Sequence, residues 1–316
     1  MLVAETARQE DDIFVYMGGN QPVPARVRRA RIHISVKIIP RRAFYDRHSL
    51  ISVEFHDGIE IIEEQAFSGC WSLKSVKLLG VRIIKQSAFW NCNSMTDVEF
   101  GDKLEAIEVH AFSTCVSLRK IRMPSVRTIG RWSFNNCREL IDVEFGEGLQ
   151  TLKDAFGSCT KLKRIALPLK GDMIRNNALN QCPKLEAVDL VGGIHQTVAS
   201  LHMKSWRSEM MDEINRINQT LPTTTTGKKT GVIQQWMETV IHRLDHYKAE
   251  HHKALLKEAT TLLELALWKA NLDDNGGGKI EREGHRTRGS RKRARKEISV
   301  TSGADVVIKN VLPFLA

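Results

Sequence analysis

The six cysteines are the residues of this chain best suited to chemistry, and all of them occupy one position of a recurring phrase. Each follows a Phe, or in the last copy a Leu, by three residues: Cys70, Cys92, Cys115, Cys137, Cys159 and Cys182. Regularly spaced thiols suit either a metal site or a set of disulfides. Zinc sites use paired C-x-x-C clusters, which single cysteines in file do not supply, and disulfides persist in oxidising compartments. We therefore expect buried structural thiols, with metal binding and disulfides as the competing interpretations.

The phrase that carries the cysteines is A-F-x-x-C-x-x-L-x-x-V-x-F, and its Phe recurs in steps of 22 or 23 residues from Phe44 to Leu179. Alternation in V-x-F is typical of a strand. Repeats that cannot bury their own apolar face must stack, and like positions then form continuous columns. The fold class we predict is an α+β repeat protein: a β-solenoid of seven 22–23-residue repeats with a parallel sheet, whose strands lie about 4.8 Å apart.

The repeated phrase at this spacing resembles the BspA-type leucine-rich repeat. The later segments, among them "IQQWM" and "LLKEATTLLELALWKANLD", are similar to a group of BspA-type repeat proteins abundant in diatoms. The resemblance covers nearly the whole chain. It implies a leucine-rich-repeat solenoid and a role in protein interaction, and it implies no reaction.

The outward positions of the predicted sheet carry charges whose sign alternates from one repeat to the next. We take the following as candidate protein-binding residues: Glu54, Lys77, Glu99, Arg122, Glu144, Arg164 and Asp189. Opposite charges on neighbouring strands stabilise the register. The same stripes also suit a docking surface for a partner with complementary stripes. Because acids and bases balance, the face is poorly suited to phosphates.

After residue 195 the period ends, and residues 196–274 are predicted to form a helical hairpin. Apolar residues recur at helical spacing over 200–219 and again over 232–272, with "LPTTTTGKKTG" between them. Such a hairpin either caps the open end of the solenoid or presents a coiled-coil-like surface to another helix.

Two motifs in this half are discounted. In "PTTTTGKK", Pro222 stands where a phosphate loop needs its first Gly, and Lys229 where it needs Ser or Thr. Glu238, His242, His246 and Glu250 share one helical face, yet such a stripe more often forms i,i+4 pairs than a zinc site.

The formal charge of +10 is concentrated in two tracts, 26–42 and 286–296, each with seven Lys or Arg and no acid. The first alternates apolar and charged residues, so we read it as a capping rung that begins the solenoid domain, 26–195, after a flexible segment, 1–25. The second lies in a predicted disordered basic linker, 275–300, ahead of an apolar C-terminal element, 301–316. The candidate import signal is Arg291, Lys292, Arg293, Arg295 and Lys296. A solubilising linker and a nucleic-acid tether are the alternatives.

These observations predict a non-catalytic scaffold or adaptor that binds another protein. No nucleophile elbow, paired-cysteine motif or phosphate loop indicates catalysis, and no cofactor or metal is expected. The acidic start of the chain has no signal-peptide pattern, and no apolar run of bilayer length occurs. We therefore expect an intracellular protein, cytoplasmic or nuclear, without a membrane partner. An import receptor is a further expected partner, and nucleic-acid association through the basic tracts is the alternative function.

Overall fold

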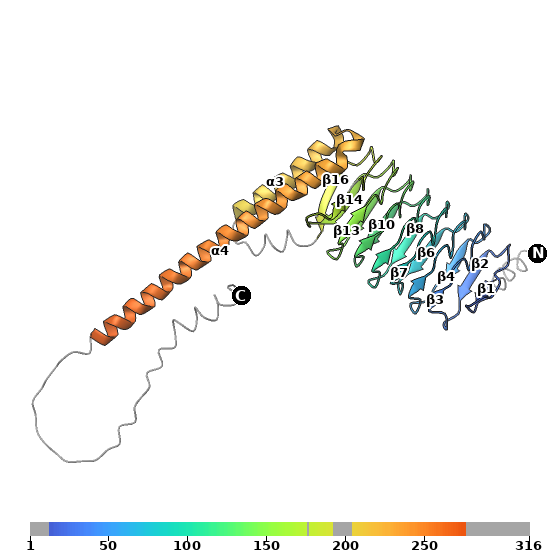
Figure 1. The fold of residues 1–316 in the computed structure, drawn as a ribbon, viewed down its shortest axis with the longest axis horizontal. Coiled ribbons are helices and arrows are strands. Elements are labelled where there is room, and N and C mark those ends of the chain that lie inside the picture. Colours follow the sequence, from blue (N-terminus) through green and yellow to red (C-terminus); the bar gives the residue numbers. More distant parts are fainter. Residues whose placement is uncertain (1–12, 176, 192–203, 276–316) are drawn as a thin grey trace, which may run out of the picture. The chain divides into compact units, whose positions relative to one another are not determined.

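Two parallel β-sheets form the solenoid in the computed structural model, which describes residues 13–175, 177–191 and 204–275 (Figure 1). The larger sheet has nine strands in chain order. Its strands are β1 (Ile13–Tyr16), β2 (Arg29–Ile32), β4 (Ser52–Glu54), β6 (Ser75–Leu78), β8 (Asp97–Phe100), β10 (Lys120–Met123), β12 (Asp142–Phe145), β14 (Arg164–Pro168) and β16 (Ala187–Val191). The V-x-F units thus become strands of one sheet, as the alternation predicts.

A second, seven-stranded sheet forms from short apolar segments between those units, such as Ile59-Glu60-Ile61-Ile62, which the sequence analysis did not read as strands. Its members are β3 (Ile38–Ile39), β5 (Ile61–Ile62), β7 (Ile83–Ile84), β9 (Ala106–Ile107), β11 (Thr128–Ile129), β13 (Thr151–Lys153) and β15 (Ile174–Arg175). Most are two residues long. Each is therefore held by pairing with its neighbours in the sheet and not by its own propensity.

The solenoid begins earlier than expected. Residues 13–16, inside the segment that we predicted to be flexible, form β1 and pair in parallel with β2 over four residues. The sequence Ile13-Phe14-Val15-Tyr16 has the β-branched and aromatic character of a strand, but it lies outside the 22–23-residue period. The outermost rung is consequently β1, and 26–42 supplies β2 and β3 within the two sheets.

The core consists of stacked columns, as equal repeat lengths require. The rings of Phe44, Phe67, Phe89, Phe112, Phe134 and Phe156 are completely buried, and successive ring centroids lie 4.8 to 5.3 Å apart. The six cysteines form a second buried column of free thiols. Fully buried Leu or Met residues follow at the L position of the phrase.

A third column, which we call the turn column, consists of the A-F-x-x-C turns of successive repeats together with the residues that directly flank them. In most of these turns two residues have positive φ: the residue before Ala and the second residue after Phe. Examples are His110 at 57° and Thr114 at 64°. Such non-glycine conformations cost about 1–3 kcal/mol each. Hydrogen bonds from one turn to the next hold them, such as Phe112 N to Ser133 O at 2.7 Å and Thr114 N to Asn135 O at 2.8 Å.

Two helices follow the last described strand: α3 (Lys204–Thr220) and α4 (Lys229–Asn275), with short 3-10 turns η1 (Leu221–Thr223) and η2 (Thr226–Lys228) between them. Their bounds lie within a few residues of the predicted ones. The chain divides into two compact units, residues 1–243 and 244–316. The first unit contains α3 and the start of α4, which pack on the last repeat, so the predicted capping role is met there.

Five hydrogen bonds join the helices to the end of the solenoid. Asn218 accepts from the Val188 amide at 2.9 Å, Thr230 accepts from the Leu179 amide at 3.3 Å, and Gln234 donates to the Ile174 carbonyl. Lys229 donates to two carbonyls, of Pro183 at 2.8 Å and of Leu185 at 2.5 Å. The terminal rung therefore has its exposed backbone groups occupied by helical side chains. None of the described helices has an apolar stretch sufficient to cross a bilayer.

Candidate interaction surfaces

The predicted docking residues lie on the outer face of the nine-stranded sheet, and each of the seven is ion-paired with a neighbouring strand. The pairs are Arg31–Glu54, Lys77–Glu99, Arg122–Glu144 and Arg164–Asp189, and Arg164 also pairs with Asp142. Lys77 and Glu99 are direct partners in the strand register, as are Arg122 and Glu144. The alternating stripe therefore becomes a row of closed ion pairs along the sheet.

These ion pairs are exposed, so each contributes little to the free energy of folding. In the Lys77–Glu99 pair, at 3.0 Å, the side chains are 75% and 47% exposed. Exposed pairs are worth about 0.2–1 kcal/mol. Their repetition still favours the observed register, because a shift of one residue along a strand would separate the paired charges and set them opposite buried apolar positions. The face as a whole is neutral and accessible.

The sequence analysis missed a second set of paired charges on the seven-stranded sheet. The residue directly before each short strand carries a charge whose sign alternates from one strand to the next. These residues are Lys37, Glu60, Arg82, Glu105 and Arg127. Arg82 donates to Glu105 at 2.8 Å, and Lys85 pairs with Glu63 at 2.8 Å. The same column-wise reading that found the first stripe would have found this one.

The arginines of the basic tract 26–42 do not form an isolated cationic patch. Arg31 pairs with Glu54 and Arg41 pairs with Glu64. Arg42 Nε donates to the side-chain oxygen of Gln65. The acids of the following repeat thus neutralise the tract in part. Clustered, unopposed Lys and Arg are what a phosphate backbone requires.

The cysteine thiols serve as hydrogen-bond donors within the core. Each Sγ donates to the carbonyl of the Phe in the preceding repeat, for example Cys115 to Phe89 at 3.2 Å and Cys137 to Phe112 at 3.3 Å. Burial raises the pKa of Cys115 to about 12, and that of Cys70 likewise. A buried neutral thiol is a poor nucleophile and a poor metal ligand. The six cysteines are thus structural, and spacing alone did not reveal their carbonyl partners.

Lys229, which stands where a phosphate loop needs Ser or Thr, is turned into the end of the solenoid. Its side chain is almost fully buried, and its ammonium group is held by the two carbonyls at the end of the solenoid. Burial lowers the pKa of Lys229 below its usual value. Over the described residues, no group of three or more His, Cys, Asp or Glu side chains is arranged to hold a metal ion.

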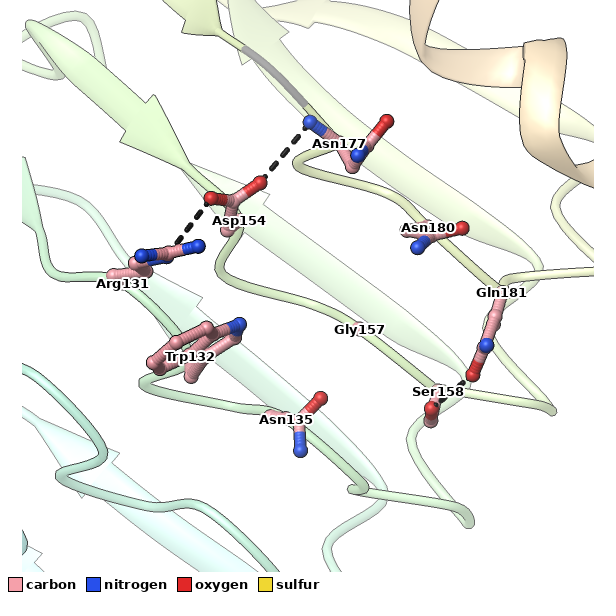
Figure 2. A pocket seen from close by; sticks show the side chains of 9 residues that line it. All are labelled: Arg131, Trp132, Asn135, Asp154, Gly157, Ser158, Asn177, Asn180 and Gln181. Carbon is pink, nitrogen blue, oxygen red and sulfur yellow. Dashed lines mark hydrogen bonds and ion pairs between the residues drawn. The ribbon is translucent and has the colours of Figure 1, made fainter.

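A polar hollow of about 620 Å³ lies on the turn column, over the turns that begin near residues 131, 154 and 177 (Figure 2). Arg131, Trp132, Asn135, Asp154, Gly157, Ser158, Asn177, Asn180 and Gln181 line it. Nothing in the sequence analysis indicated this site, because its residues come from three repeats and carry no motif.

Some predicted elements lie outside the described residues. These are the candidate import signal, Arg291, Lys292, Arg293, Arg295 and Lys296, together with most of the basic linker 275–300 and the C-terminal element 301–316.

Comparison with known proteins places the chain in a family. A model of the BspA type leucine rich repeat region matches with six copies, over residues 26–141 and 82–205. The stacked Phe and Cys columns are the structural counterpart of that match. The chain belongs to the BspA-type leucine-rich repeat proteins.

Solved structures with the same kind of repeat are distant in sequence. A leucine-rich repeat protein from Bacteroides ovatus is 24% identical, with a TM-score of 0.40 over 54% of this chain and 48% of that one. The T. pallidum leucine-rich repeat protein is 20% identical, with a TM-score of 0.39 over 62% and 91% of the two chains. This chain spans about half the length of the B. ovatus protein. A search of curated proteins finds no match.

Proposed function

We propose that this protein is a non-catalytic scaffold that binds another protein through the outer face of its nine-stranded sheet. The observation that carries the proposal is the row of interstrand ion pairs on that face, which holds exposed charges in fixed positions on a rigid sheet. Preorganised groups lose little entropy on binding. Charge stripes favour a partner with complementary stripes and disfavour others. Family membership supports the same role, because repeat solenoids present extended binding surfaces.

A charge exchange within one ion pair tests this proposal. The double variant Lys77→Glu with Glu99→Lys keeps an ion pair between these two strands and reverses the charges that a partner meets there. It also sets exposed like charges beside Glu54 and Arg122, at a small cost. We expect proximity labelling or affinity capture with the intact chain to identify partners that the exchanged variant loses, while the melting temperature changes little. The matched control exchanges Arg82 with Glu105, an equivalent pair on the seven-stranded sheet.

If both exchanged variants capture the same proteins as the wild type, the nine-stranded face is not the docking surface. If capture depends instead on residues 286–296 and falls steeply with salt, the chain is nucleic-acid-associated through its basic tract.

We further propose that residues 291–296 direct the chain to the nucleus. The support is their composition alone, a short cluster of Lys and Arg of the kind that import receptors read. Imaging of the tagged full chain beside a variant with Lys292 and Arg293 changed to Ala tests the proposal. Unchanged nuclear signal, or none in either chain, would refute it.

A further inference from the structure

The turn column differs chemically from both sheets. Between Gln65 and Pro183, its outward positions are mostly amides, hydroxyls and aromatic rings, with few charges. Three of the six tryptophans of the chain lie on it: Trp71, Trp90 and Trp132. Its backbone amides and carbonyls are largely taken up by hydrogen bonds between successive turns. A ligand on this face must therefore be recognised mainly by side chains.

The hollow on this column is lined by polar groups without partners. Among the described residues, the side-chain amides of Asn135, Asn177 and Asn180 have no hydrogen bond, and neither has the indole nitrogen of Trp132. Figure 2 shows these groups arranged around Gly157, with the indole nitrogen turned toward the middle of the hollow. Each amide offers both donors and an acceptor.

The remaining polar groups hold the walls in place. Arg131 pairs with Asp154 at 3.1 Å and lies over the Trp132 ring, 3.9 Å from its centroid. The ring of His110 stacks on Trp132 at 5.0 Å. Ser158 donates to the side-chain oxygen of Gln181 at 2.5 Å. The charges of Arg131 and Asp154 offset each other, and the site has no net attraction for an anion or a cation.

Gly157 creates the hollow. The corresponding position, one residue after the Phe, is Trp90 in the third repeat, where the side chain projects and is 42% exposed. At Gly157 the backbone has no positive φ, and an added Cβ would meet only the end of the Asn135 side chain, at 2.5 Å. The position therefore tolerates a larger residue, and its glycine leaves the space between Asn135 and Asn180 open.

We propose that this hollow binds a neutral glycan. A sugar hydroxyl both donates and accepts hydrogen bonds, as the lining amides do, and a neutral polyhydroxylated ligand matches a site without net charge. An extended peptide fits less well, because it is recognised through main-chain pairing at a free strand edge or through apolar pockets, and the hollow provides neither. The proposal goes beyond protein binding by the sheet face and uses separate residues.

Variants of the intact chain, applied to arrays of free glycans that include neutral, sialylated and sulfated members, test the proposal. The variant Gly157→Trp fills the hollow with the residue type that the column already holds at Trp90. The double variant Asn135→Ala with Asn180→Ala removes two amides without filling the space. The matched control is Asn215→Ala, an exposed asparagine on α3 away from the hollow.

The wild type and Asn215→Ala should retain a set of neutral glycans, and saturation-transfer NMR should detect the same ligands in solution. Both hollow variants should lose affinity by about tenfold or more, roughly the effect of removing one or two net hydrogen bonds. A glycoprotein bearing the same glycan, before and after enzymatic deglycosylation, then distinguishes a free oligosaccharide from one attached to a protein.

Three outcomes would overturn the proposal: no glycan retained by the wild type, retention confined to acidic glycans, or retention unchanged in both hollow variants. Binding of extended peptides, lost in Gly157→Trp, would replace the glycan with a peptide as the ligand. None of these outcomes bears on partner capture by the nine-stranded face, which the Lys77 and Glu99 exchange tests separately.

Discussion

Apolar side chains are buried in the repeats and largely exposed in the later part of α4. In the solenoid, Phe112 is completely buried between the rings of Phe89 and Phe134. In the second unit, Leu265, Leu267 and Trp268 are 55%, 59% and 63% exposed. Equal repeat lengths give every apolar side chain a neighbour one rung away. A single helix supplies no such neighbour, and apolar character by itself does not produce burial.

The largest expected effect is a loss of stability of the solenoid at alkaline pH. Burial raises the pKa of five core thiols, to about 12 at Cys70 and Cys115 and well above the usual value at Cys92, Cys137 and Cys159. A raised pKa in the folded state means that the folded chain keeps protons that the unfolded chain loses. Stability is therefore complete below the unfolded pKa near 9 and is lost as pH rises toward the folded value, by about 1.4 kcal/mol per pH unit and thiol.

Urea unfolding followed between pH 7 and 11 measures this loss. A variant with Ser at positions 115 and 137 keeps hydroxyl donors to Phe89 and Phe112 but cannot titrate in this range. It should show a shallower decline above pH 9 than the wild type. Equal slopes would mean that the core thiols do not control the alkaline transition.

The comparison between the two regions is tested next by paired truncations of aromatic residues. Phe112→Ala removes a ring from the middle of the stack and should lower the free energy of unfolding by about 3–5 kcal/mol, because a cavity remains among fixed neighbours. Trp268→Ala, in an exposed position, should change it by about 0.5 kcal/mol or less. Chemical denaturation measures both. A large effect at Trp268 would show that α4 packs against something in solution.

The junction between solenoid and helices should show an intermediate effect. Lys229→Met leaves the buried carbonyl of Leu185 and the part-buried carbonyl of Pro183 without their donor, at a cost of about 1–3 kcal/mol for the buried group. The adjacent Lys228 is exposed, so Lys228→Met is the matched control and should be nearly neutral. Thermal unfolding of the two variants measures the difference. Equal melting temperatures would contradict the capping role of Lys229.

Among the contacts within the solenoid, the smallest expected effect lies on the sheet face. Lys77→Glu places a carboxylate opposite Glu99 and should destabilise the chain by about 0.2–1 kcal/mol, since both groups are exposed. Adding Glu99→Lys should restore part of the loss, because the pair between positions 77 and 99 returns while position 99 then has a like charge at Arg122. A double-mutant cycle measures the interaction free energy between residues 77 and 99. A value of zero would show that this pair does not stabilise the strand register.

Several structural features were predictable from particular residues. The spacing of Phe44 to Leu179 predicts the stacked repeats, and the alternation of Glu54, Lys77 and Glu99 predicts the paired stripe. The strand β1 was missed because residues 13–16 stand outside the period. The strands of the second sheet were missed because two residues are too few for a periodic signal. A sequence pattern reveals a strand only when the strand is longer than the two-residue period of its side chains. Shorter strands form because neighbouring strands pair with them.

The sequence by itself determined that segments of equal length stack, because a constant repeat length places like residues above one another whatever the rest of the fold. Only the tertiary structure decided what those residues contact: the Phe carbonyls that accept from the thiols, the carbonyls that hold Lys229, and the open space over Gly157. Each of these contacts joins residues more than 20 positions apart. Their geometry depends on the distance between rungs and on the size of neighbouring side chains, which no local pattern encodes.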